Sequence, residues 1–73
     1  MESTIDLLKL AGMKTNLVVD AGKITTLDLI QIAGMIGLKG GHLKITNCHK
    51  KTTEDLMQII TVYPQNITLD FSS

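Results

Sequence analysis

Residues 25–35 read TTLDLIQIAGM, and two related copies of this segment flank it in the chain. The other copies are STIDLLKLAGM at residues 3–13 and TTEDLMQIITV at residues 52–62. Each copy opens with a hydroxyl residue three positions before an aspartate, which is a pattern typical of a helix N-terminus. The copies begin at residues 3, 25 and 52, and self-similarity at a spacing of about 20–50 residues is typical of stacked supersecondary units. The repeat therefore predicts three helices of one kind.

Each predicted helix has a capping residue, an acidic first turn and one apolar face. The expected N-caps are Ser3, Thr25 and Thr52, and the first-turn carboxylates are Asp6, Asp28 and Asp55. The expected buried set is Leu7, Leu8, Leu10 and Ala11, then Leu29, Ile30, Ile32 and Ala33, then Leu56, Met57, Ile59 and Ile60. The equivalent polar position, which we expect to point to water, holds Lys9, Gln31 and Gln58.

A short alternating segment follows each helix, at residues 17–20, 43–46 and 67–70, after loops that include residues 37–41 and 64–66. A sheet buried on both faces has nearly continuous apolar strands, whereas these segments alternate between apolar and polar residues. We therefore expect helices on one sheet face only. The side chains predicted to point toward the helices are Leu17, Val19, Leu43, Ile45, Ile67, Leu69 and Phe71.

The predicted fold class is α/β, with the element order αβαβαβ. Short connections between alternating helices and strands imply parallel strands and right-handed crossovers. The three strands should lie side by side in sequence order, with every helix on one face. Seventy-three residues make a single domain near the lower size limit for independent folding. Its three αβ units are expected at about residues 3–20, 25–46 and 52–71.

The second unit carries a further pattern, LKITNC at residues 43–48, followed by Thr53, Asp55 and Leu56. It resembles the cysteine-containing leucine-rich repeat, in which L-x-L-x-x-C precedes a helix with T-D-x-x-L. The steps between strands, 26 residues from Leu17 to Leu43 and 24 from Leu43 to Ile67, fall in that family's range. The resemblance covers residues 16–71 and implies a short leucine-rich-repeat-like solenoid.

Residues 17–29, LVVDAGKITTLDL, carry a second resemblance. They look like the strand, loop and helix of the anti-sigma-factor-antagonist (STAS) domain. In that domain a hydroxyl residue at the helix N-terminus is phosphorylated. The resemblance implies that Thr25 or Thr26 would be the modified residue.

The composition excludes several classes of partner and location. Seven basic and seven acidic residues give no formal net charge, so the electrostatic footprint of a nucleic-acid or anionic-membrane binder is missing. A single cysteine cannot form an internal disulfide, and Glu2 and Asp6 stand where a secretion signal would have a basic region. No apolar run approaches the roughly 18 residues of a membrane helix. We expect a cytoplasmic protein with no nucleic-acid and no membrane partner.

The side chains that could act as a nucleophile or a metal ligand lie around the second strand, at His42, Cys48 and His49. Acidic or thiol ligands at zinc spacing do not accompany them, and neighbouring side chains tend to diverge. Cys48 is most simply a small buried apolar residue. The glycines of residues 37–41 fit no nucleotide-binding motif and suggest a flexible turn. We therefore predict no catalytic residue, no cofactor and no metal site, and whether the chain is an enzyme stays open, with the balance toward no.

The preferred function is a small non-catalytic protein-interaction or assembly module that presents an open parallel sheet face or a sheet edge. The candidate binding face consists of Asn16, Val18, Asp20, His42, Lys44, Thr46, Asn66, Thr68 and Asp70. The expected partner is a protein or a second copy of the chain. A homodimer would form by antiparallel pairing at the edge of residues 67–71, which Thr68→Pro should block, or by packing around Val18 and Phe71.

The alternative function is a STAS-like phospho-switch or a small enzyme that uses the carboxyl ends of the strands. In a parallel sheet these ends share one edge. The side chains that would gather there are Asp20, Thr46, Asn47, Cys48, His49 and Asp70.

Overall fold

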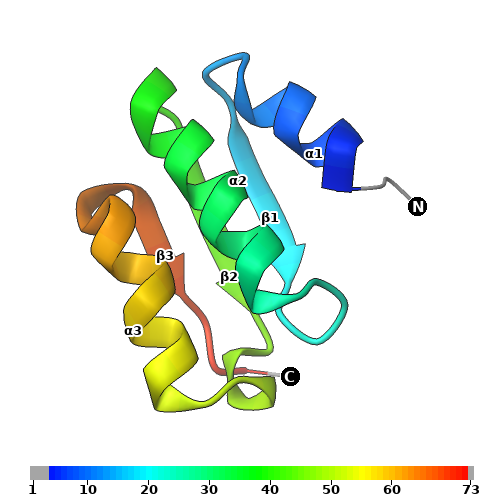
Figure 1. Ribbon diagram of the computed structural model, residues 1–73, viewed down its shortest axis with the longest axis vertical. Helices are drawn as coiled ribbons and strands as arrows, with labels where there is room; N and C mark the ends of the chain where they lie inside the picture. The colour runs from blue at the N-terminus through cyan, green and yellow to red at the C-terminus, as the bar shows by residue number, and fades with distance from the viewer. Residues whose placement is uncertain (1–3, 73) are drawn as a thin grey trace.

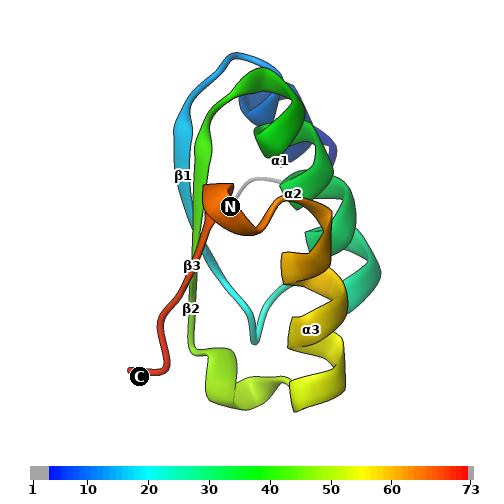
Figure 2. The same ribbon diagram turned by 90° about the vertical axis from the view of Figure 1, so that its left-hand side faces the viewer.

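The computed structural model describes residues 4–72 as a parallel sheet of three strands with three helices packed on one face. The elements follow one another as α1 (Thr4–Ala11), β1 (Asn16–Asp20), α2 (Thr26–Lys39), β2 (His42–Thr46), α3 (Thr53–Val62) and β3 (Ile67–Leu69). Two 3₁₀ turns, η1 (Cys48–Lys50) and η2 (Pro64–Asn66), stand before α3 and β3. The strand order is β1-β2-β3, and Figure 2 shows the helices together on one side. The predicted αβαβαβ order is confirmed.

The helix starts of the second and third units are capped as the repeat predicts. The hydroxyl oxygen of Thr25 accepts a hydrogen bond from the amide of Asp28 at 3.2 Å, and that of Thr52 accepts one from Asp55 at 3.1 Å. Each bond satisfies an amide that has no partner inside its own helix, which is worth about 1 kcal/mol. The predicted cap at Ser3 lies outside the described residues.

The end of α2 differs from the prediction, because Gly37 belongs to the helix and is not part of a flexible turn. Gly40 ends α2 with a left-handed backbone, φ 81°. Its amide donates to Gly37 O at 3.2 Å, and the amide of Gly41 donates to Ile36 O at 2.9 Å. This is the Schellman pattern, which fixes the turn. Gly37 is needed for a different reason, since a Cβ there would overlap the ring of Tyr63.

The core lies between the sheet and the helix layer and is centred on the second unit. The side chains of Leu29, Ile32, Ile36, Leu43 and Ile45 are fully buried. Parallel register places Leu17, Leu43 and Ile67 in one row across the sheet and Val19, Ile45 and Leu69 in another. The helix layer therefore covers two apolar rows.

Three residues predicted to be buried are exposed. Leu10 is 45% exposed and Met57 is 58% exposed because α1 and α3 stand at the two ends of the helix layer, so each has a helix on one side only. Phe71 is 58% exposed because β3 ends at Leu69. Beyond β3 the chain turns away, held by the amide of Ser72, which donates to the Asp70 carboxylate at 2.9 Å.

Candidate protein-interaction surface

The sheet face opposite the helices brings most of the predicted binding residues together (Figure 2). Strand register aligns Asn16 with His42, Val18 with Lys44 and Thr68, and Asp20 with Thr46. Because alternate residues of a strand share a face, these side chains form a continuous polar surface with Val18 as an apolar member, 67% exposed.

Polar contacts link neighbouring strands across this face. The ring nitrogen Nε2 of His42 lies 2.7 Å from the hydroxyl of Thr68, and Lys44 Nζ lies 3.6 Å from the carboxylate of Asp70. The Lys44–Asp70 pair is exposed and screened by solvent, so it contributes little to the stability of the fold.

Asn66 occupies a different place from the other predicted members. It lies in η2, before β3 begins, and is half-buried. Its side-chain amide donates to the carbonyl of Gly41 at 2.8 Å and so ties the turn before β3 to the turn before β2. The role that the structure gives Asn66 is therefore to hold two adjacent units together.

Asp20 anchors the carboxyl end of β1. Its carboxylate accepts hydrogen bonds from the amide of Gly22 at 2.8 Å and from the side-chain amide of Asn47 at 3.0 Å. The bond from Gly22 is the main cause that lowers the pKa of Asp20 below its ordinary value of 3.8, with help from Asn47 and from nearby Lys23 and Lys50. Asp20 is therefore an ionised structural acceptor near neutral pH and a poor proton donor.

Asp70 plays a similar part at the end of β3. Hydrogen bonds from the hydroxyl and amide of Ser72 lower its pKa, and Lys44 contributes in the same direction. The carboxylates of Asp20 and Asp70, at the carboxyl ends of β1 and β3, are thus held in the charged form by neighbouring groups.

Cys48 and His49 do not form a common site. The Cys48 side chain is fully buried, with Sγ donating to the carbonyl of Ile45 at 3.1 Å, which confirms the prediction of a buried residue. Burial raises the pKa of the thiol, so the nucleophilic thiolate is disfavoured. His49 is exposed on η1. Of the six residues expected at the carboxyl ends of the strands, Asp20 and Asn47 are joined by a side-chain hydrogen bond.

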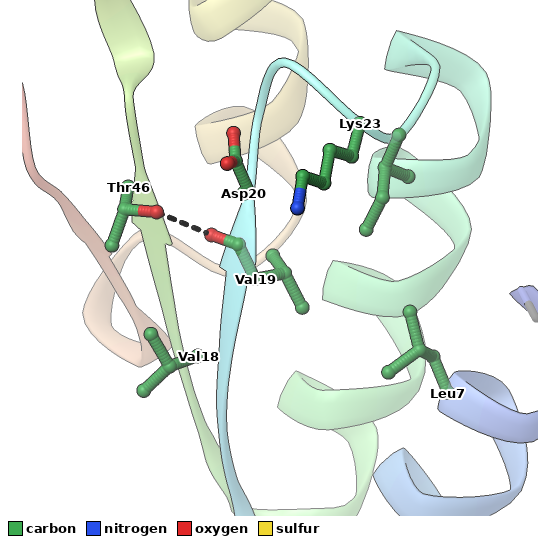
Figure 3. Close-up of a pocket in the computed structure, with 7 residues that line it drawn as sticks. Leu7, Val18, Val19, Asp20, Lys23 and Thr46 are labelled. Carbon is green, nitrogen blue, oxygen red and sulfur yellow. Dashed lines mark hydrogen bonds between the residues drawn. The ribbon is translucent and has the colours of Figure 1, made fainter. Parts of the chain in front are cut away.

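A pocket of about 210 Å³ lies at the carboxyl end of β1 (Figure 3). Its walls include Leu7, Val19 and Ile24 on the helix side, Val18 on the open side, and Lys23. The nearby hydroxyl of Thr46 donates to the carbonyl of Val19 at 3.1 Å. The pocket is therefore a recess at the end of β1 with aliphatic walls, and the polar side chains of Asp20, Lys23 and Thr46 also line it.

In the part of the chain that the structure describes, the outer strands of the sheet are β1 and β3, and each has one edge without a strand partner. On β3, the amide of Asp70 donates to Ile45 O at 2.8 Å, toward β2. Because strand amides alternate in direction, the amide of Thr68 also faces β2, whereas that of Leu69 faces outward. Thr68→Pro would therefore break the internal ladder, and the expectation that it reports on edge pairing is wrong.

Sequence reasoning missed the apolar side chains at the ends of the helix layer. Among the described residues, large apolar side chains are exposed at Ile5, Leu10, Met13, Val18, Leu27, Leu38, Met57 and Phe71. For Leu10 and Met57 the missing signal was positional, because a residue that is buried in the middle unit of an array loses a neighbour in the first or last unit. Leu27 and Leu38 instead lie on α2, the middle helix, and Val18 lies on the sheet face that we expected to be open.

Comparisons with protein-family models, with curated proteins and with solved structures found no match to the chain. Within residues 4–72, no group of three or more His, Cys, Asp or Glu is placed to hold a metal ion. No helix in that part of the chain is long and apolar enough to cross a membrane.

Proposed function

We propose that the protein is a non-catalytic assembly module, built as a short leucine-rich-repeat-like solenoid, whose partner is a second copy of the same chain. The solenoid interpretation is supported by three αβ units that stack in sequence order with parallel strands and helices on one face. The cysteine of the repeat pattern, Cys48, closes the core beneath Ile45, as the pattern requires.

The observation that carries the proposal is the apolar surface at the ends of the array. Met13 is 75% exposed beside the first helix, and Met57 is 58% exposed on the last. Met13 directly follows α1 and Met57 lies on α3, the two helices at the ends of the helix layer, and the outer strands β1 and β3 have no further strand beside them among the described residues. Exposed apolar side chains beside unpaired strand edges are typical of association surfaces.

The groups that a phospho-switch or an enzyme would need are engaged in structural roles, which favours the assembly module. The Thr25 hydroxyl caps α2, the Cys48 thiol is buried, and the Asp20 carboxylate binds Gly22 and Asn47. A combined variant tests this alternative. Thr25→Asn keeps a capping side chain, and Thr26→Ala removes the second hydroxyl, so that neither position can be phosphorylated. Cys48→Ala with His49→Ala removes the thiol and the imidazole.

Molar mass measured by light scattering between about 1 μM and 1 mM tests the function, since this range spans the affinities of weak and moderate protein complexes. We expect the mass of the parent to rise with concentration and the combined variant to follow the same curve. A parent mass that stays monomeric over the whole range contradicts the assembly function. An associating parent with a monomeric but folded combined variant favours the reactive site instead.

A further inference from the structure

The contact between adjacent units is built the same way twice. Met35 of α2 lies over Gly12, with its Sδ 3.9 Å from the position of a glycine Cβ. Val62 of α3 lies over Gly34 in the same manner, with Cγ1 at 3.6 Å. In the sequence repeat, Gly12 and Gly34 are equivalent, and so are Met35 and Val62. Each unit therefore covers the small residue of the unit before it.

The first and last units each have one half of this contact without a partner among the described residues. Met13 holds the position of Met35 and Val62, but it is 75% exposed where they are half-buried. Its amide donates to Leu10 O at 3.0 Å, which continues the helical path beyond α1. At the other end, Thr61 holds the position of Gly12 and Gly34, and it is exposed.

A second set of equivalent residues shows the same direction of stacking, with one side of each helix facing the preceding unit and the other facing the following unit. Ile59 is fully buried although the only helix beside α3 is that of the preceding unit, so this repeat position faces the preceding unit. Its equivalent in the first unit, Leu10, is 45% exposed. Leu8 is half-buried although α1 has only a following neighbour, so its position faces the next unit; its equivalent in the last unit, Met57, is 58% exposed. The two ends are thus complementary halves of one interface.

The sheet also has two complementary ends, one at β1 and one at β3. The apolar row of Val19, Ile45 and Leu69 stops at β1 on one side and at β3 on the other. The recess at the end of β1 has aliphatic walls from Leu7, Val19 and Ile24, with polar side chains of Asp20, Lys23 and Thr46 also lining it. A continued row would place another apolar side chain next to Val19. Leu69 of a second copy would supply it.

We infer that copies of this chain associate head to tail, with the first unit of one copy packed on the third unit of another as adjacent units pack within the chain. This inference rests on the proposed assembly function and specifies its geometry. The interface is heterologous, because one copy contributes β3 and α3 and the other contributes β1 and α1. We call the exposed side of the first unit the head and the exposed side of the third unit the tail. A dimer of this kind leaves one head and one tail free, so further copies can add to it.

One pair of residues limits the affinity of this contact. Continuing the sheet rows places Asp70 of one copy beside Asp20 of the next, since Asp20 aligns with Thr46 and Asp70 directly follows the row of Ile45 and Leu69. Like charges at neighbouring cross-strand positions are destabilising. Asp70→Asn should therefore strengthen the association of the parent chain.

Variants that block one end each test the geometry. Met13→Glu places a charge in the head, and Met57→Glu places one in the tail. Either should weaken self-association by about tenfold or more, because a charge would be buried in an apolar contact. The matched control is Leu27→Glu: Leu27 is 66% exposed, and the third unit already has Glu54 at the equivalent position. It should associate like the parent, and circular dichroism should show all three variants folded.

Mixing the two blocked variants gives the decisive result. Each is expected to be monomeric alone, whereas the mixture should form a one-to-one dimer and nothing larger, since the intact tail of Met13→Glu meets the intact head of Met57→Glu. If the parent associates and either blocked variant dimerises equally well alone, the head-to-tail geometry is wrong while the assembly function stands. A parent that remains monomeric at every concentration overturns both.

Discussion

Cys48 shows most directly what burial does to a reactive side chain. It is the one cysteine of the chain, and its side chain is fully buried with a raised thiol pKa. We expect Cys48 to react with an aromatic disulfide reagent at least about tenfold more slowly in the folded protein than in denaturant, because reaction requires local opening. Equal rates in both conditions would show that the thiol is accessible and that the packing around Ile45 is wrong.

Asp20 links the end of β1 to the pH dependence of stability. Its pKa is lowered in the folded state, so the carboxylate stabilises the fold above the unfolded-state pKa. This contribution is lost as pH falls through the lowered folded-state value. Asp20→Asn should therefore be less stable than the parent at pH 7, and the difference should narrow below pH 3.8, the ordinary value. Denaturant titrations at several pH values test this, and a pH-independent difference contradicts it.

Two glycines of α2 make a matched pair at the scale of the element. Alanine in place of a helical glycine normally stabilises by up to about 1 kcal/mol. Gly34→Ala should show this gain, because its Cβ would lie 3.6 Å from Val62 Cγ1, an ordinary contact. Gly37→Ala should destabilise, because its Cβ would overlap the ring of Tyr63. Thermal melting of the two variants should move in opposite directions, and a stabilised Gly37→Ala would contradict the packing of Tyr63 on α2.

The helices of the second and third units each bury a leucine at the same repeat position. Leu29 is fully buried and Leu56 is 7% exposed. Truncation of either to alanine should cost about 2–5 kcal/mol, with Leu29→Ala nearer the upper end because α2 has helices on both sides. Denaturant unfolding measures both. Losses well under 1 kcal/mol at both positions would mean that the repeat alignment does not define the core.

Local patterns predicted the elements well because they act within one unit. The caps at Thr25 and Thr52 and the alternation along β1 and β2 depend only on neighbouring residues. The errors came from longer range. Gly37 was predicted as a loop residue because the side chain that requires a glycine there, the ring of Tyr63, lies 26 positions away in the sequence. Leu10 and Met57 matched the buried pattern, but whether a helix has a neighbour on each side is a property of the array.

The candidate surface was predictable in its members and not in its contacts. Alternation along the strands placed Val18, Lys44 and Thr68 on one face, and the register aligns them. The pairing of His42 with Thr68 and of Lys44 with Asp70 depends on which strands are neighbours and how they are shifted, which one sequence does not specify. The same is true of which strand amides face outward.

As a whole molecule, the chain buries its middle unit and leaves its end units partly open. A domain of this size buries only about 60% of its unfolded surface, so the exposed ends are a substantial part of the apolar area that it could still bury. Repeat proteins usually close such ends with polar capping units. Within residues 4–72, both ends of the array keep exposed apolar side chains and strands with one unpaired edge, and these are the surfaces that we propose for association.

Amide hydrogen exchange at low and high protein concentration would detect association through the two outer strands. The amides of Val18 on β1 and Leu69 on β3 face outward at the two free strands, because the amide of Ala21 donates to Thr46 O and that of Asp70 donates to Ile45 O. Head-to-tail stacking of the αβ units predicts that both outward amides exchange more slowly at high concentration, by about tenfold or more when most copies are associated. Unchanged exchange of both amides, or slower exchange of one of them alone, would rule out head-to-tail stacking of the αβ units.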